Sequence, residues 1–300
     1  MSAKSRALLI LTYHRVLEAE DPLRRGEITQ HAFAKHLRVL RRWFTVLPLS
    51  QAWRRTRERT LPARAVAITF DDGYADNAEL ALPILRHVGL PATFFVATGF
   101  LDGGRMWNDT IIESLRVARA PLDLRDLDGG LLATDDVAAR AAAVERVIGA
   151  WKRLPPAERQ RRVAALVERA QAAPPDNLMM RSDQVAQLAQ AGMEIGAHTV
   201  SHPILRSISD EEAATEMRNS RATLEALTGA QVTTFAYPNG RLGDDYDTRH
   251  AEIAKRVGFE LAVSTNGGSA RADSDAYQLP RFGPWAESDW RFAARLLRAY

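Results

Sequence analysis

The chain has 300 residues, 46% of them hydrophobic, which is long enough to bury the core of one large α/β domain. Its formal net charge is only +3 and its pI is about 9.4, without the basic stripe that is typical of nucleic-acid binders. We therefore expect no nucleic-acid partner. The absence of cysteine excludes disulfides, iron–sulfur clusters and thiolate zinc sites, so a metal would have to bind to His, Asp or Glu.

The first apolar run covers residues 7–13 and follows a short basic start. It is at the lower limit for the core of a signal peptide, and Tyr13, His14 and Arg15 stand where a small-residue cleavage site would be. We interpret the run as a first β-strand and expect a cytoplasmic protein, with export left open. No stretch approaches the roughly 20 apolar residues of a membrane span, so we expect no integral membrane segment.

Short apolar runs alternate with stretches of helical periodicity along the chain. This alternation indicates an α/β fold with a parallel sheet, and at this length we expect the sheet to close into a barrel. In chain order the predicted elements are a strand at 7–13, a helix at 32–44, strands at 66–70 and 92–97, a helix at 183–191 capped by Ser182, a strand at 193–195, a helix at 211–227 ended by Gly229, a strand at 232–237, a helix at 247–257 ended by Gly258, and strands at 261–265 and 277–282.

Residues 109–177 interrupt the alternation. They carry Ala, Arg and Leu in helical patterns, with breaks at Pro155-Pro156 and Pro174-Pro175 and a turn at Gly129-Gly130. We interpret them as a helical insertion in a barrel loop, within one domain that covers residues 1–300. The insertion is either a solvent-facing decoration, which is the simpler interpretation, or a lid or partner-binding surface.

Two pairs of polar residues follow predicted strands, namely Asp71 with Asp72 and, far downstream, His198 with His202. Adjacent side chains in a strand point to opposite faces, so both carboxylates reach one cavity only where the chain turns. Gly73 permits the φ values that such a turn needs. Taken alone, Asp-Asp-Gly is more typical of an ordinary turn.

His198 and His202 lie four residues apart and would share a face if their segment forms one helical turn. The chain has seven histidines, so the pair carries weight only together with Asp71 and Asp72. The four residues together predict a hydrolytic centre with one divalent metal at the carboxyl ends of the strands. Imidazole and carboxylate ligands suit Zn²⁺ first, with Ni²⁺, Co²⁺ or Fe²⁺ as alternatives.

Three motifs resemble those of the polysaccharide deacetylases, the carbohydrate esterases that share the NodB homology domain. Residues 69–73 (TFDDG) and 198–203 (HTVSHP) look like the first two motifs of that family, and residues 235–240 (FAYPNG) are similar to the loop that forms one wall of its groove. The motifs occur in the order of the family. The resemblance implies a distorted (β/α) barrel of the NodB type and metal-dependent removal of N- or O-linked acyl groups from a sugar.

The resemblance also implies a role for each matching residue. Asp72, His198 and His202 correspond to the metal ligands. Asp71 corresponds to the general base, and the backbone N–H of Asn239 to the donor that stabilises the oxyanion. The implied partner is an acetylated carbohydrate substrate.

One departure from the family concerns the arginine that holds the catalytic aspartate in place. Many members carry that arginine where this chain has Ala236. Arg241 and Arg281 are the candidates to replace it.

A second departure concerns the general acid, because the usual C-terminal Leu-His-Asp-like motif is absent and no histidine follows His250. Residues 12–16 (TYHRV) resemble the start of a circularly permuted branch, typified by poly-N-acetylglucosamine deacetylases, in which the strand with that histidine opens the domain. His14 is therefore the expected acid, since the first strand of a closed barrel neighbours the last. The alternative is a structural histidine.

Several residues are candidates for substrate binding. Aromatic rings stack against sugars, but for each ring, packing in the core or on the surface is an equal alternative. The predicted substrate-binding set is Tyr74, Trp107, Tyr237, Pro238, Arg281 and Trp285.

These observations predict a metal-dependent hydrolase that removes acetyl groups from N-acetylhexosamine residues of a glycan or glycan precursor. Within enzymes, the alternatives are an O-acetyl esterase and a hydrolase of small cyclic amides on the same scaffold. A different class is a catalytically inactive glycan-binding barrel, for which Ala236 is the best argument. The oligomeric state stays open.

Overall fold

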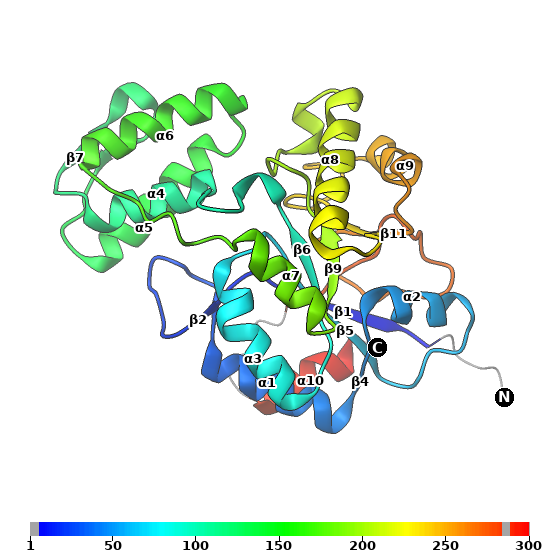
Figure 1. The fold of residues 1–300 in the computed structure, drawn as a ribbon. Helices are drawn as coiled ribbons and strands as arrows, with labels where there is room; N and C mark the ends of the chain where they lie inside the picture. Colours follow the sequence, from blue (N-terminus) through cyan, green and yellow to red (C-terminus); the bar gives the residue numbers. More distant parts are fainter. Residues whose placement is uncertain (1–5, 284–288, 300) are drawn as a thin grey trace. The chain divides into compact units, whose positions relative to one another are not determined.

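A computed structural model of the chain describes residues 6–283 and 289–299 (Figure 1). The chain divides into two compact units. The first comprises Met1–Ala19, Ile28–Asp102 and Met179–Tyr300, and the second comprises Glu20–Glu27 and Gly103–Leu178. Within the described residues, no helix has both the length and the apolar character needed to cross a membrane.

The first unit is built around a curled parallel sheet, as the sequence predicts for a distorted α/β barrel (Figure 1). Its strands are, in spatial order, β1 (Leu8–Tyr13), β5 (Ala65–Phe70), β6 (Thr93–Val96), β9 (Glu194–Ala197), β10 (Thr234–Ala236) and β11 (Leu261–Val263), and the short β4 (Thr45–Val46) also pairs with β5. A separate two-stranded sheet joins β2 (Val16–Leu17) to β3 (Ile28–Thr29).

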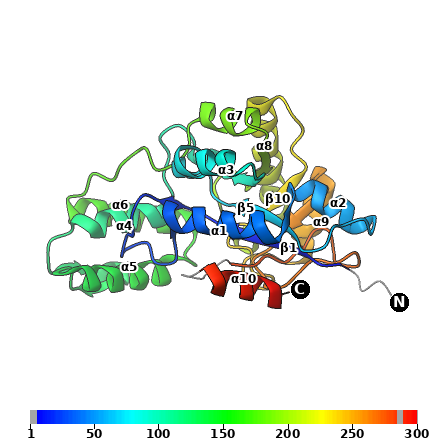
Figure 2. The ribbon, with the colours of Figure 1, turned by 90° about the horizontal axis from the view of Figure 1, so that it is seen from below.

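Helices surround this sheet, and Figure 2 shows α1 and α10 side by side along one edge of the unit. The predicted helices at 32–44, 211–227 and 247–257 are confirmed to within two residues at each end. The helices of the first unit are α1 (Gln30–Trp43), α2 (Leu49–Arg57), the π-helical turn Asn77–Ala81, α3 (Leu82–Val88), α7 (Ser182–Gln190), α8 (Asp210–Thr228), α9 (Thr248–Val257) and α10 (Asp289–Arg298).

Side chains of β1 alternate between two apolar clusters, one on each face of the sheet. Leu9 and Leu11 belong to the large cluster that includes Phe33 of α1, whereas Leu8 and Ile10 pack with Trp53 of α2. Every residue of β5 is likewise buried. Strands that are covered on both faces read as continuous apolar runs, which explains why sequence patterning located them.

Residues 279–282 lie between β11 and β1, where the sequence predicts a last strand at 277–282. Leu279 pairs with Val263 and Phe282 with Leu11, each as an isolated bridge. The predicted strand is wrong because Pro280 has no N–H to donate to a ladder, and the N–H of Arg281 turns away to the Asn266 carbonyl at 3.0 Å.

Helix caps follow the sequence signals except at α7. Ser182, the predicted cap, is the first helical residue, and Arg181 precedes it as the N-cap. The Ser182 hydroxyl and N–H donate instead to the carboxylate of Asp102, at 2.6 and 2.9 Å. Gly229 and Gly258 end α8 and α9 in the left-handed conformation, as the sequence predicts.

The second unit has its own apolar core, which includes Trp151 and Leu166. Where the sequence predicts only helices, the structure also has an antiparallel hairpin. Residues 20–27 belong to this unit too, because Arg24 pairs with Asp109 at 2.5 Å and with Glu113 at 2.8 Å. Its elements are α4 (Trp107–Val117), β7 (Leu122–Leu124), β8 (Gly130–Leu132), α5 (Val137–Trp151) and α6 (Pro156–Ala170).

Candidate metal and catalytic centre

The chain turns sharply after β5, at the carboxyl edge of the sheet. Asp71 continues the ladder by donating its N–H to the Tyr13 carbonyl at 2.9 Å. Asp72 and Gly73 then both have positive φ, of 75° and 88°. A Cβ at Gly73 would lie 2.9 Å from Cγ1 of Val96, so glycine is needed for space as well as for conformation. The turn gives the two aspartates different neighbours.

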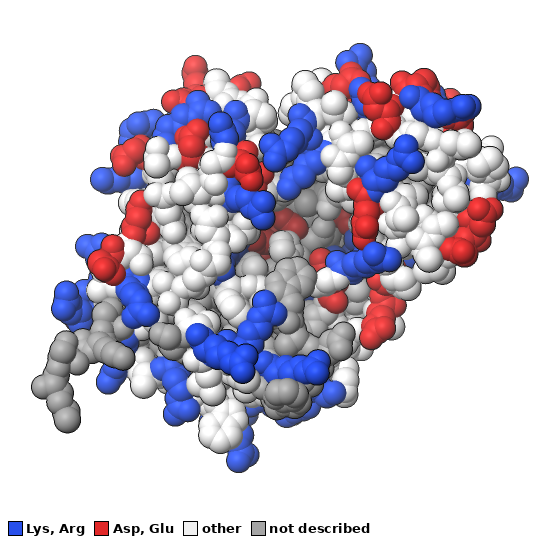
Figure 3. Space-filling model, turned by 180° about the vertical axis from the view of Figure 1, so that it is seen from behind, with Lys and Arg blue, Asp and Glu red and all other residues white. Residues whose placement is uncertain are grey.

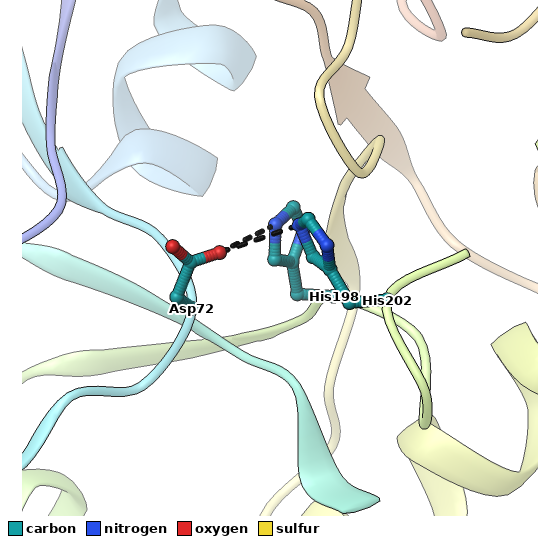
Figure 4. A group of neighbouring side chains, drawn as sticks. All are labelled: Asp72, His198 and His202. Carbon is teal, nitrogen blue, oxygen red and sulfur yellow. Dashed lines mark ion pairs between the residues drawn. The ribbon is translucent and has the colours of Figure 1, made fainter. Parts of the chain in front are cut away.

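Asp72 faces His198 and His202 (Figure 4). Its Oδ1 lies 3.4 Å from Nε2 of each imidazole, and one ligand atom from each of the three residues lies within 4.8 Å of the others. The predicted helical turn between the histidines is wrong: Thr199 and His202 have φ of 65° and 52°, so the chain folds back through a loop. The histidines therefore converge through left-handed backbone conformations and not through i,i+4 helical spacing.

The orientation of His198 and the pKa of His202 both suit a metal site. Nδ1 of His198 donates to the carbonyl of Ala236 at 2.8 Å, which fixes the ring so that Nε2 faces Asp72. Burial lowers the pKa of His202 to about 4, although the charge of Asp72 opposes this shift. His202 is therefore neutral at neutral pH, as a metal ligand must be.

The carboxyl group of Asp72 is ionised in this environment. Burial acts to raise its pKa, but the hydrogen bond from His198 and the charges of His202 and His14 bring the pKa well below its usual range. Two imidazole nitrogens and one carboxylate oxygen form a donor set that suits Zn²⁺ and related divalent ions. The residues thus fit the metal that the sequence predicts.

Asp71 faces Arg281 in a buried, bidentate pair. Nη1 and Nη2 of the arginine lie 2.7 and 2.6 Å from the two carboxylate oxygens. Nε of Arg281 donates to the Ser264 carbonyl at 2.9 Å, and the whole residue is only 2% exposed. Burial acts to raise the pKa of Asp71, but the charge of Arg281 and its hydrogen bonds lower it overall.

This pair identifies which arginine accompanies Asp71 in place of the one missing at Ala236. Arg241 is exposed, and its guanidinium lies 3.6 Å from Asp244. Arg281 also leaves the predicted substrate-binding set, because its guanidinium is enclosed with Asp71.

His14 lies beside the aspartates because β1 and β5 are parallel neighbours with Tyr13 opposite Phe70. The positive charge of a protonated His14 lowers the pKa of both Asp71 and Asp72. The sequence argument relied on the first strand lying next to the last, and residues 279–282 do lie beside β1, with Phe282 bridged to Leu11, although they form no regular strand. The direct neighbour β5 is what brings His14 to the site.

A buried polar cluster supports the backbone around His14. Nδ2 of Asn77 donates to the His14 carbonyl at 2.8 Å and to the Asp76 carboxylate at 3.0 Å. Asp76 also accepts from Nε of Arg15 at 2.7 Å and from the N–H of Val16 at 3.1 Å. Sequence reasoning missed this cluster, although Asp76 and Asn77 follow shortly after Asp-Asp-Gly.

Asn239 lies in the loop after β10, with φ of 59°. Its carbonyl accepts from the Thr265 hydroxyl at 2.7 Å, and the N–H of Gly240 donates to the Pro238 carbonyl at 2.6 Å. Among the residues that the structure describes, none accepts a hydrogen bond from the Asn239 N–H. This N–H is therefore available as a donor to a ligand.

The predicted sugar-stacking rings have other surroundings in the structure. Tyr237 is fully buried, stacks on Tyr246 with ring centroids 3.8 Å apart, and donates its hydroxyl to the Tyr277 carbonyl. Tyr74 is 3% exposed beneath the guanidinium of Arg15. Both rings have the packing role that the sequence left as the alternative.

The remaining members of the predicted substrate-binding set divide three ways. Trp107 belongs to the second unit, where it is half-buried with the Arg159 guanidinium 4.8 Å from its ring centroid. Pro238 is buried in the loop before Asn239. Trp285 lies outside the described residues.

Charges of both signs are interspersed on the face shown in Figure 3, where basic side chains form separate groups. This distribution agrees with the small net charge of the chain.

Comparison with known proteins gives one consistent result. The polysaccharide deacetylase family matches residues 58–123 and 131–262, which are more than half of the chain and include all three motifs. A candidate polysaccharide deacetylase of Bacillus subtilis, YxkH, is 22% identical over 280 residues, which are 93% of this chain and 71% of that protein.

Solved structures share the fold over nearly the whole chain. The deacetylase PplD of Streptococcus pyogenes, solved in complex with acetate, is 21% identical with a TM-score of 0.67 and 99% of each chain covered. IcaB from Ammonifex degensii is also 21% identical, with a TM-score of 0.62 and 97% of each chain covered. Taken with the family match, these findings show that the chain belongs to the polysaccharide deacetylase family.

Proposed function

We propose that this protein is a metal-dependent hydrolase that removes acetyl groups from N-acetylhexosamine residues of a glycan or glycan precursor. The observation that carries the proposal is the convergence of Asp72, His198 and His202 next to an aspartate that a buried arginine holds. Membership of the family supports glycan deacetylation as the class of activity. The sugar, the amide linkage and the metal dependence are the proposal.

Asp72, His198 and His202 would hold one divalent ion, with Zn²⁺ as the first candidate. When bound, such an ion supplies a Lewis acid that polarises the acyl carbonyl and lowers the pKa of a coordinated water. The protein's own contribution is to present two imidazoles and one ionised carboxylate to a single point.

Asp71 is the proposed general base. A water molecule that attacks the acyl carbon must lose a proton as the new C–O bond forms, and a carboxylate within reach can accept it. Arg281 keeps Asp71 ionised and fixes its orientation, while each carboxylate oxygen retains a further lone pair. The same arginine lowers the pKa of Asp71, which makes the carboxylate a weaker base. The arginine therefore contributes by fixing the position of the base and not by raising its basicity.

Asn239 and His14 are proposed to complete the reaction. The tetrahedral intermediate carries an oxyanion, to which the N–H of Asn239 can donate. The C–N bond then breaks, and the departing amine nitrogen needs a proton because an amide anion is a poor leaving group. His14 is the proposed donor, since its charge acts on both aspartates from the adjacent strand end.

The alternative of a catalytically inactive glycan-binding barrel loses its main support. That alternative rests on Ala236, which stands where many family members carry an arginine. Arg281 supplies a guanidinium to Asp71 from another part of the chain, so the substitution at Ala236 does not leave the aspartate without a partner.

The test is acetate release from N-acetylated chitooligosaccharides, with free amines measured in parallel. We expect both products in the presence of Zn²⁺, loss of activity with a chelator, and recovery when Zn²⁺ is added back. An Asp72→Asn variant serves as the inactive control. Release from O-acetylated xylooligosaccharides alone would identify an esterase, and chelator-insensitive binding without acetate would identify a glycan-binding barrel.

A further inference from the structure

The loop between His198 and His202 is fastened to α8 by one side chain. We propose that Glu216 is a positioning residue that holds this loop in the shape that brings the two imidazoles together. The inference rests on the proposed metal-dependent function. It extends that function by assigning a role to a residue that lies outside the three sequence motifs.

The Glu216 carboxylate accepts three short hydrogen bonds from the loop. Its Oε2 accepts the N–H of Val200 at 2.7 Å and that of Ser201 at 2.8 Å. Its Oε1 accepts the Ser201 hydroxyl at 2.7 Å. Hydrogen bonds to an ionised acceptor are stronger than those between neutral groups, so these three contacts fix the middle of the loop.

The carboxylate is presented by a rigid element. α8 is 19 residues long and begins with a reciprocal cap between Ser209 and Glu212. Its buried residues include Ala213 and Met217, which flank Glu216 along the helix and anchor it in the main apolar cluster. Glu216 therefore acts from a fixed position, as a residue that orients ligands must.

The loop needs such support because its backbone is unfavourable. Thr199 and His202 both have φ in the left-handed region, which costs of the order of 1 kcal/mol or more for a side chain other than glycine. Thr199 is also β-branched, which makes this region still less favourable. Conformations of this kind persist only where surrounding contacts outweigh their cost.

The opposite side of the loop is held by the backbone after β6. The N–H of Thr98 donates to the Thr199 carbonyl at 3.2 Å, and the N–H of Gly99 donates to the Val200 carbonyl at 2.8 Å. A Cβ at Gly99 would lie 2.7 Å from that Val200 oxygen, so only glycine allows this approach. The loop thus lies between two supports, of which Glu216 is the one made by a charged side chain.

The donors to Glu216 belong to residues between the two histidines, which links the carboxylate to metal affinity. Without it, the N–H groups of Val200 and Ser201 lose their acceptor, and the loop can relax toward favourable φ values. Nε2 of His198 and His202 would then separate. Residues that orient metal ligands typically change affinity by roughly 10- to 100-fold when they are removed.

The first experiment measures Zn²⁺ affinity of the full chain by competition with a chromophoric chelator. We expect the Glu216→Ala variant to bind Zn²⁺ about 10- to 100-fold more weakly than the unmodified chain. We expect a smaller loss for Glu216→Gln, because its single amide oxygen can still accept from the loop. The matched control is Glu211→Gln, an exposed residue of the same helix, which should leave the affinity unchanged.

The second experiment needs neither metal nor substrate. In the metal-free protein, hydrogen exchange at the amides of Val200 and Ser201 should be faster in Glu216→Ala than in the unmodified chain. The thermal unfolding midpoint of this variant should stay close to that of Glu211→Gln, because a local support is lost and not the core. A purely structural role for Glu216 would instead lower the midpoint and leave the Zn²⁺ affinity of the folded protein unchanged.

These measurements distinguish failure of the proposed role of Glu216 from failure of the proposed function. Unchanged Zn²⁺ affinity in both Glu216 variants, or unchanged exchange at Val200 and Ser201, would overturn the role of Glu216. If the unmodified chain itself binds no Zn²⁺, the proposed function fails, and hydrogen exchange still decides whether Glu216 holds the loop. If Glu216→Ala does not fold, the isosteric Glu216→Gln variant decides.

Discussion

The two ends of the parallel sheet both enclose a carboxylate, with opposite results. At the carboxyl end, Asp71 is paired with Arg281, and its pKa is lowered. At the amino end of β9, Glu194 accepts hydrogen bonds from neutral donors, which include the N–H of Ser50 and the hydroxyl of Thr93, and burial raises its pKa. At these two carboxylates, the bidentate arginine outweighs the effect of burial on the pKa of Asp71, whereas the neutral donors do not outweigh it at Glu194.

The contrast between Asp71 and Glu194 shows which end of the sheet can hold a buried negative charge. An ionised carboxylate inside a protein needs a paired cation or several strong donors, because burial penalises the charged form. The catalytic end has such a cation, and the amino end does without one. Four predictions test this contrast between the ends, beginning with the largest expected effect.

The first prediction concerns the ligand set at the carboxyl end. His198→Ala removes a nitrogen ligand whose Nδ1 is fixed by the Ala236 carbonyl. We expect Zn²⁺ binding at least about 100-fold weaker, since even partners that only orient ligands change affinity by 10- to 100-fold. Titration with Zn²⁺ under competition and acetate release would both report the loss. The exposed His31 offers a control, because His31→Ala should leave both measurements unchanged.

The second prediction makes the carboxyl end resemble the amino end. Arg281→Met leaves Asp71 buried without its cation, which typically costs about 3–5 kcal/mol of unfolding free energy. We expect acetate release to be lost while Zn²⁺ still binds, because Arg281 contacts none of the three ligands. Urea unfolding and Zn²⁺ titration check the two parts. Arg241→Met, at an exposed pair, should change stability by less than about 0.5 kcal/mol; an equal effect would refute the special place of Arg281.

The third prediction concerns the turn that separates the two aspartates. Gly73→Ala is unfavourable in φ and also meets Cγ1 of Val96 at 2.9 Å, so we expect a loss of about 1–3 kcal/mol together with lower activity. Gly89→Ala isolates the first cause, since Gly89 has φ of 71° but nothing within 4 Å of an added Cβ. Chemical denaturation should show the larger loss at Gly73. Equal losses at the two positions would mean that space around Val96 is not limiting.

The fourth prediction concerns the amino end and has the smallest effect. The pKa of Glu194 is raised in the folded state, so its contribution to stability is fully present below the ordinary glutamate pKa of 4.5 and is lost as the pH rises through the folded value. Glu194→Gln stays neutral at every pH. The difference in unfolding free energy between this variant and the unmodified chain should therefore shift in favour of the variant as the pH rises from 4 to neutral. Urea unfolding at several pH values checks the slope. A difference that does not depend on pH would show that Glu194 titrates normally.

Local sequence patterns were enough for most of the strands, and the family resemblance added to them the three residues of the candidate metal site. The run at 66–70 and the Asp-Asp-Gly after it are contiguous, so apolar patterning and one glycine located both the strand and the turn. The two histidines are near neighbours in a motif that follows β9, so the sequence located them together, although the loop between them depends on contacts with α8 and with the backbone after β6. Family resemblance then assigned different roles to Asp71 and Asp72. In the structure the two aspartates also have different neighbours, Arg281 for Asp71 and the two histidines for Asp72.

The tertiary structure decided what depends on distant pairing. Arg281 meets Asp71 across 210 residues because residues 279–282 pass beside β1, and no local pattern distinguishes this arginine from Arg241. The same reason applies to His14, whose place follows from the parallel register of β1 with β5. Short-range periodicity and turn chemistry are written in neighbouring residues, whereas the partner of a buried charge is set by how the sheet curls. The sequence thus determined most of the strands, the turn and the candidate metal-binding residues, and the fold determined what holds them.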